Sequence, residues 1–179
     1  MADKPPPPPD SAFGLVISAH DHCKNEKIIT LPIDSMAYHK DFETIREHCP
    51  PQIAHWHRYI LWRTLMSCRK SGWVQARKDV DIPEFPTDPL VMQQLAERWV
   101  YRGGLGEIRL SADNLPYSPY FDRFCNDEVV RSLFLSKHAL SRYMITGRKM
   151  AGSKIFQAHK GNLEPKGLWK ISMTIRNVP

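Results

Sequence analysis

The chain has 179 residues, of which 42% are hydrophobic and 10% aromatic, enough to bury the core of one domain. Its formal net charge is +6, but residues 131–179 hold ten Lys or Arg against one acid, a net +9, which leaves −3 for residues 1–130. Arginines spaced through the stretch 50–72 exclude a membrane-spanning helix. The basic end predicts a polyanionic partner, either nucleic acid or an anionic membrane surface.

The N-terminal residues 1–10 include five consecutive prolines, Pro5 to Pro9. Such a run cannot form a helix or a central strand, so we predict a disordered, mobile, proline-rich tail that acts as a spacer or as a docking ligand. No apolar signal-peptide segment is present, and four scattered cysteines indicate free thiols in a reducing compartment. We therefore expect an intracellular protein.

The folded part begins with two predicted strands, 11–19 and 27–32; in the first, Phe13, Leu15 and Ile17 recur at every second position. A helix capped by Asp34 or Ser35 follows. Further strands are predicted at 73–77, 107–111, 154–159 and 168–176. No internal repeat is apparent.

Residues 50–72 are predicted to form one central helix, around which the fold is organised. Pro50 and Pro51 can open it, and Gly72 can end it in a left-handed cap. A helical wheel gives one broad apolar face, whose members we expect to be buried: Ile53, Trp56, Ile60, Leu61, Leu65 and Cys68.

Two more helices follow. Asp88 as cap and Pro89 at the first helical position predict one that ends at Gly103 and Gly104, and Asn126 caps another. Strands and helices in this order predict an α+β fold. We expect a single domain over residues 11–179, with an antiparallel sheet packed against helices and a strongly basic C-terminal third.

Histidines and cysteines concentrate between residues 20 and 68, which raises the possibility of structural zinc. The candidate ligands are Cys23, Cys49, His55 and His57. Their spacing matches no standard zinc finger, and a regular helix would point His55 and His57 in different directions. We therefore favour buried thiols and a core histidine over a metal, and expect no cofactor.

Catalytic motifs are absent from the sequence. No glycine-rich phosphate loop follows a strand, and there is no nucleophile elbow or His-Glu-x-x-His motif. The acidic residues between 78 and 88 fit a solvated, proline-rich loop better than a nuclease or cation site. We expect a protein that is not an enzyme.

The segment 146–154 has glycines near both ends, three positive charges and no periodicity, which predicts an exposed basic loop. No acid lies nearby in the sequence to neutralise its charges. Together with the basic residues that follow, this segment supplies the predicted polyanion-binding residues: Arg148, Lys149, Lys154, Lys160, Lys166 and Lys170.

Residues 167–176 read Gly-Leu-Trp-Lys-Ile-Ser-Met-Thr-Ile-Arg, which is similar to the Gly-apolar-Met-Thr-Ile strands of vesicular stomatitis-type matrix proteins. With its short basic chain and proline-rich N-terminus, the sequence resembles the matrix proteins of rhabdoviruses, including plant-infecting ones. The resemblance implies an α+β fold, self-association, condensation of a ribonucleoprotein and peripheral membrane attachment. Two features depart from that pattern: Pro9 is followed by Asp10 rather than a Pro-Pro-x-Tyr motif, and the basic charge lies at the C-terminal end.

These observations together predict a non-enzymatic, matrix-like viral structural protein. It would form homo-oligomers and bridge a viral nucleocapsid or RNA and an anionic membrane during virion assembly in the host cytoplasm. The alternative function is a soluble RNA-binding regulator, such as a viral silencing suppressor, with zinc as an optional stabiliser.

Overall fold

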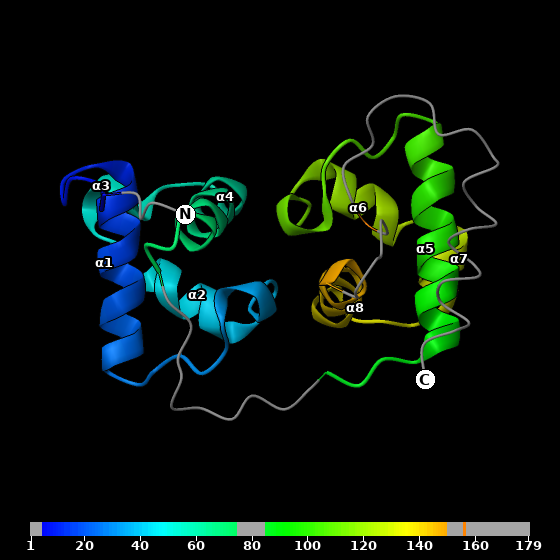
Figure 1. Ribbon diagram of the computed structural model, residues 1–179, viewed down its shortest axis with the longest axis horizontal. Helices are drawn as coiled ribbons and strands as arrows, with labels where there is room; N and C mark the ends of the chain where they lie inside the picture. Colours follow the sequence, from blue (N-terminus) through cyan, green and yellow to red (C-terminus); the bar gives the residue numbers. More distant parts are fainter. Residues whose placement is uncertain (1–4, 75–84, 150–155, 157–179) are drawn as a thin grey trace. The chain divides into compact units, whose positions relative to one another are not determined.

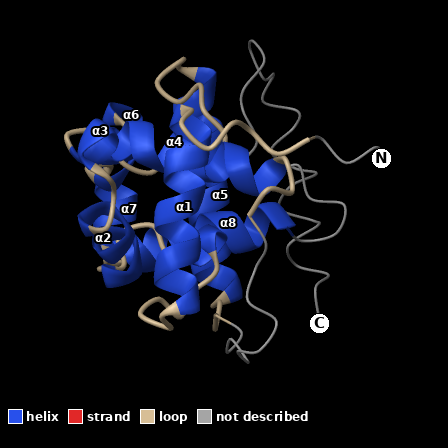
Figure 2. Ribbon diagram, turned by 90° about the vertical axis from the view of Figure 1, so that its left-hand side faces the viewer, coloured by secondary structure: helices blue, strands red, loops and turns tan. Residues whose placement is uncertain are grey.

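The computed structural model describes residues 5–74, 85–149 and Phe156, and within these ranges every regular element is a helix (Figure 2). The prediction of an α+β fold with an antiparallel sheet is therefore wrong for the described residues, which form no strand. The predicted strands 154–159 and 168–176 lie outside the described residues but for Phe156. The chain divides into two compact units, residues 1–83 and 84–179 (Figure 1).

The described residues of unit 1 form four α-helices and one 3-10 helix. They are α1 (Ala12–Asn25), η1 (Ile33–Ser35), α2 (Lys40–Glu47), α3 (Pro51–Ala54) and α4 (Arg58–Lys70). Its core is centred on the fully buried Trp62 of α4, which packs edge-on against Phe42 of α2 with ring centroids 5.9 Å apart. Helix α4 also packs against α1, so the last helix of the unit is held by the first.

Helix α1 replaces the strand predicted over residues 11–19. The Ser11 hydroxyl accepts a hydrogen bond from the Gly14 amide at 3.1 Å and so caps the helix. The buried residues of α1 follow helical spacing: Val16, Ala19, His20 and Cys23. The alternation that suggested a strand covers only the first turn and a half. Before α1, Pro8 and Pro9 lie against Gly14, where a Cβ atom would meet the Pro8 carbonyl oxygen; the mobility predicted for residues 1–10 stays a prediction.

The single central helix predicted over residues 50–72 is wrong, because it breaks into α3 and α4. Pro51 does open α3, and Gly72 follows α4 with the predicted left-handed φ of +76°. Between the two helices, His57 begins a new cap: its Nδ1 accepts the Tyr59 amide at 3.2 Å. The break changes which residues face inward. Leu61 is buried as expected, whereas Ile60 is 49% exposed and Trp56 is half-buried.

Unit 2 likewise has four α-helices and one 3-10 helix within residues 85–149. They are α5 (Pro89–Gly104), η2 (Ala112–Asn114), α6 (Pro119–Cys125), α7 (Glu128–Ser132) and α8 (Lys137–Lys149). The prediction for α5 is confirmed, with Asp88 as its cap and Pro89 at its first position. Trp99 of α5 is the centre of this core and packs edge-on against Phe124 and Phe156. Residues 107–111, predicted as a strand, form no regular element.

The two units repeat one another, which the sequence analysis missed. Each runs long helix, 3-10 helix, two shorter helices, long helix. Elements in matching places start 79 residues apart: Ile33 and Ala112, Lys40 and Pro119, Arg58 and Lys137. The backbone repeats too, since Tyr38 and Tyr117 both have a positive φ, of 59° and 62°.

The same 79-residue offset aligns identical side chains. The identical pairs are Ile29 and Ile108, Leu31 and Leu110, Asp34 and Asp113, Tyr38 and Tyr117, Phe42 and Phe121, Leu61 and Leu140, Arg63 and Arg142, Arg69 and Arg148, and Lys70 and Lys149. Both phenylalanines and both helix leucines of this set are buried. The repeat therefore extends from the fold to the residues that make its core.

Each unit has a buried carboxylate that joins neighbouring segments, and the two carboxylates occupy different positions in the repeat. In unit 1, Asp41 accepts the backbone amides of Thr30 and Leu31 at 2.6 and 2.7 Å. In unit 2, Asp127 caps α7 and forms ion pairs with Arg98 and Arg102 of α5, both at 2.6 Å. Burial alone would raise the pKa of Asp127, but the hydrogen bonds from the two arginines outweigh it and lower the pKa to about 2.

Replacing Trp62 tests the core of unit 1. We expect Trp62→Ala to lower the free energy of unfolding by about 3–5 kcal/mol, because it empties a fully buried site. Ile60→Ala, two residues away on the same helix, should cost about 1 kcal/mol or less, because Ile60 is half exposed. Urea denaturation of both variants checks this. Equal losses would contradict the break between α3 and α4.

Replacing Asp127 tests how acid weakens unit 2. The folded pKa of about 2 lies below the ordinary 3.8, so the ionised carboxylate stabilises the fold above pH 4, by ~2 kcal/mol, and this stability is lost as the pH falls toward 2. Asp127→Asn should lower the free energy of unfolding at pH 7 and flatten its decline between pH 4 and 2. Urea titrations at several pH values measure both effects.

Asp122→Asn is the matched control, because Asp122 forms an exposed ion pair with Lys137. If the control lost as much stability at pH 7 as Asp127→Asn, the buried carboxylate would not be what joins α5 to α7.

Candidate nucleic-acid interface

The last helix of each unit carries basic residues at the same four positions. On α4 they are Arg58, Arg63, Arg69 and Lys70, and on α8 they are Lys137, Arg142, Arg148 and Lys149. Every one of these pairs is 79 residues apart. At the same 79-residue offset, no other helix of the described residues has basic residues at matching positions in both units. Helices α4 and α8 are therefore the first candidates for a shared function.

Two of the four positions are accounted for by ion pairs within the unit. Arg69 pairs with Asp34 of η1, and Arg148 pairs with Asp113 of η2. Arg58 reaches Glu43 of α2 at 2.8 Å, and Lys137 reaches Asp122 of α6 at 2.6 Å. Each pair in unit 1 thus has its equivalent in unit 2. These cations hold the last helix against the elements that precede it.

These contacts correct the predicted basic loop. Thr146 to Lys149 form the last turn of α8, and Arg148 has an acid beside it, so the expectation of an unneutralised loop is wrong there. Lys149 is exposed. The other predicted polyanion-binding residues lie outside the described residues: Lys154, Lys160, Lys166 and Lys170. Binding of a polyanion by any of these residues stays a prediction.

The third repeated position, Arg63 and Arg142, is different, because neither guanidinium pairs with an acid among the described residues. Arg63 donates to the Tyr59 hydroxyl at 2.9 Å and lies 5.7 Å from the centroid of that ring. Arg142 lies 4.7 Å from the centroid of Phe85. Burial lowers the pKa of Arg142, although an arginine remains charged at any physiological pH. Each unit therefore keeps a half-buried arginine supported by an aromatic ring.

An aromatic residue lies just before each last helix. Trp56 and Phe134 both occupy the turn that leads into α4 or α8, and in both the amide donates to a carbonyl three residues earlier: Ile53 at 3.0 Å and Arg131 at 3.1 Å. Phe134 is 93% exposed, the highest value among the exposed large hydrophobic side chains of the described residues. Trp56 is half-buried between the exposed His55 and His57.

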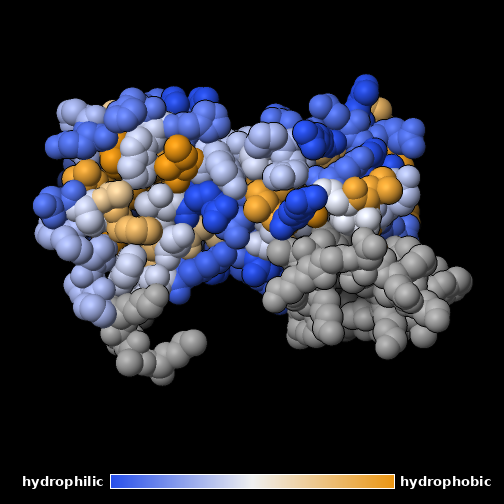
Figure 3. Space-filling model, turned by 90° about the horizontal axis from the view of Figure 1, so that it is seen from above, coloured by the Kyte–Doolittle hydropathy of each residue, from blue (hydrophilic) through white to orange (hydrophobic). Residues whose placement is uncertain are grey.

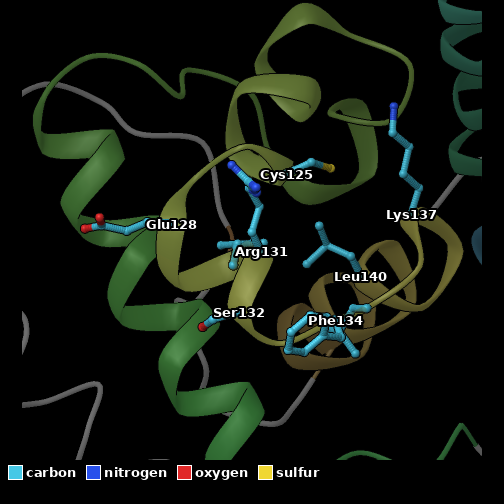
Figure 4. Close-up of a pocket in the computed structure, with 9 residues that line it drawn as sticks. Cys125, Glu128, Arg131, Ser132, Phe134, Lys137 and Leu140 are labelled. Carbon is cyan, nitrogen blue, oxygen red and sulfur yellow. The ribbon is translucent and has the colours of Figure 1, made fainter.

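Phe134 borders an open pocket of about 650 Å³ in unit 2. Figure 4 shows Arg131, Cys125 and Leu140 around this hollow, with Phe134 and Lys137 at its edge. Burial raises the pKa of the Cys125 thiol to about 11. Because only the thiolate is a good nucleophile, Cys125 is unreactive at neutral pH, and the pocket suits binding better than covalent chemistry.

The residues weighed as zinc ligands include two buried cysteines and two exposed histidines. Cys23 is buried in α1 and Cys49 is buried after α2, whereas His55 and His57 are exposed between α3 and α4. In the part of the chain that the structure describes, no group of three or more His, Cys, Asp or Glu side chains is placed to hold a metal ion. Burial raises the pKa of the Cys49 and Cys68 thiols to about 11, as expected for cysteines that serve as core residues.

The outer surface offers no large apolar area on the face shown in Figure 3, where hydrophobic residues lie in small patches between polar ones. Across the described ranges, no helix has the length and apolar character that crossing a membrane requires. Comparison with protein-family models, with curated proteins and with solved structures finds no significant match to this chain. The resemblance to rhabdovirus matrix proteins therefore stays a prediction, and its stretch 167–176 lies outside the described residues.

Neither Arg63 nor Phe134 was predicted as a site residue from the sequence. The signal that could have identified them was the repeat. Aligning residues 28–70 with 107–149 pairs Arg63 with Arg142 and brings Trp56 close to Phe134. Arg63 and Arg142 occur in both units and pair with no described acid, so they need a reason beyond the ion pairs that account for Arg69 and Arg148.

Proposed function

We propose that this protein is a non-enzymatic RNA-binding protein whose two helical units contact the phosphate backbone through α4 and α8. The observation that carries this proposal is the repeated arginine, Arg63 and Arg142. Both units retain it at the same position, and among the described residues no acid neutralises it.

The support of these arginines by aromatic rings fits phosphate recognition. A ring contacts the flat face of a guanidinium, while the N–H donors lie in its plane and point outward at the edge. Such an arginine is held in position while it keeps donors for a phosphate, although Arg63 already gives one terminal N–H to the Tyr59 hydroxyl. Lys70 and Lys149, seven residues further along each helix, add positive charge.

The polymeric nature of the ligand follows from repetition and from the sequence beyond α8. Two equivalent cationic helices suit a ligand that carries anions at many points. Residues 150–179 add five Lys or Arg against one Glu, which extends the basic character of the chain. Phosphate contacts of this kind release counterions from the nucleic acid and make binding strongly dependent on salt.

Of the two functions expected from the sequence, the RNA-binding regulator is the better supported. The matrix-like role relied on a resemblance whose implied α+β fold is wrong for the described residues. Self-association and bridging to a membrane have no corresponding support from the repeated helices. We propose that the protein binds RNA in the cytoplasm.

The direct test is the double variant Arg63→Gln with Arg142→Gln in the full chain. Glutamine keeps a polar side chain but removes the charge, so we expect affinity for a single-stranded RNA of 12 nucleotides to fall about tenfold. The slope of log affinity against log salt should become shallower by about 1.4, because each lost contact to a single strand removes about 0.7. Fluorescence anisotropy over a salt series measures both quantities.

The matched control is Lys40→Gln with Arg109→Gln, which removes two exposed charges outside the last helices. This pair should leave affinity and slope close to those of the parent. If the two double variants lost the same affinity, the effect would come from net charge and not from α4 and α8, and the proposal would be wrong.

A further inference from the structure

The turn before α8 displays a ring with no packing role in its own unit. Phe134 is 93% exposed, and its φ of +51° is a conformation that residues other than glycine seldom adopt. Hydrogen bonds from the Leu133 and Phe134 amides to the Val130 and Arg131 carbonyls close the turn. The turn therefore holds the phenyl ring outward in a defined position, where burial contributes nothing to the fold.

The neighbours of Phe134 are suited to a ligand that is partly aromatic and partly anionic. Arg131 is exposed, lines the same pocket as Phe134, and forms no ion pair with a described acid. Lys137 lines the same pocket, and Val130, Leu135 and Leu140 give it an apolar wall. One acid, Glu128, is also present at the border. The pocket, at about 650 Å³, is large enough for a nucleobase with its sugar.

We infer that Phe134 is a stacking platform for one unpaired nucleobase, with Arg131 placed to contact the adjoining phosphate. This inference rests on the proposed RNA binding and specifies that the strand is bound in unpaired form. Proteins that bind single strands combine a cationic surface with aromatic rings on which bases stack, and a ring accepts any base because every base has a flat face.

Unit 1 supports the inference independently. Its corresponding turn carries Trp56, and the residue after the helix cap is again basic, Arg58 in place of Lys137. The two turns thus share an aromatic residue and a cation, although the intervening residues differ. The cation of each turn is already paired with an acid of its own unit, so the aromatic residue is the shared feature that a common contact would explain.

The test compares RNA that has bases with RNA that lacks them, using the full chain. The probes are a 12-nucleotide oligouridylate and an abasic ribose-phosphate strand of equal length. Phe134→Leu should weaken binding of the oligouridylate about tenfold and leave binding of the abasic strand unchanged. Phe134→Trp should restore affinity. Because the ring is exposed, neither change should shift the melting temperature appreciably.

Tyr101→Leu is the control, since it removes a half-exposed ring from α5 of the same unit. It should leave both affinities as they are. If Phe134→Leu left oligouridylate binding unchanged while the Arg63 and Arg142 variant weakened it, the stacking inference would fail and the proposed function would stand. If the parent bound neither strand, both would fail.

Vesicles of phosphatidylcholine with 30% phosphatidylserine provide the remaining arm, because an exposed aromatic beside cations also suits an anionic membrane. We expect Phe134→Leu to leave co-sedimentation with these vesicles unchanged. A loss on vesicles with no loss on RNA would assign the ring to a membrane and overturn the inference.

Discussion

The contact on which each unit depends is the ion pair between its 3-10 helix and the end of its last helix. Asp34 and Arg69 are 35 residues apart, as are Asp113 and Arg148, and each carboxylate is largely buried. A buried ion pair adds little net stability, because desolvation offsets the attraction, but breaking one leaves a charge without a partner. The pair therefore contributes chiefly to specificity, because it holds the end of α4 or α8 beside the 3-10 helix of the same unit.

Because Arg69 and Arg148 are held in these ion pairs, Arg63 and Arg142 are the repeated arginines that pair with no described acid. With Arg69 fixed, Arg63 lies nearly two turns earlier on α4 and rests against Tyr59, which is four residues before it and so on the same side of the helix. Arg142 uses Phe85, which comes from outside its helix, for the same purpose. Different aromatic partners thus support one arginine position in the two units. Because the support changes while the arginine stays, the guanidinium is the feature that both units preserve.

Helix ends that depend on capping residues could be predicted from the sequence. The fold class could not be predicted in this way. Asp88 and Pro89 begin α5 and Gly72 follows α4, because caps act within one turn of chain. The strand predicted over residues 11–19 failed because Phe13, Leu15 and Ile17 alternate over only five residues, while Val16, Ala19, His20 and Cys23 set the helical face. Gly147 misled in another way. It suggested a loop, but a Cβ there would lie 2.6 Å from the Met92 sulfur and 2.7 Å from the Phe156 ring, so glycine allows α8 to pack closely against α5 and Phe156.

The candidate site depends on comparison between copies, which no single segment provides. Either unit alone offers a helix with four cations, a common feature that a solvated surface explains. Both units, however, have cations at the same four helix positions. Two of these positions form equivalent ion pairs, and a third lies beside an aromatic ring. A solvated surface alone does not explain this repetition. Two modest sites on one chain also raise the affinity for a polymer, because binding at the first increases the effective concentration at the second. A tandem of small helical units is therefore an economical way to hold a flexible strand, provided that each unit contributes a phosphate contact and a ring of its own.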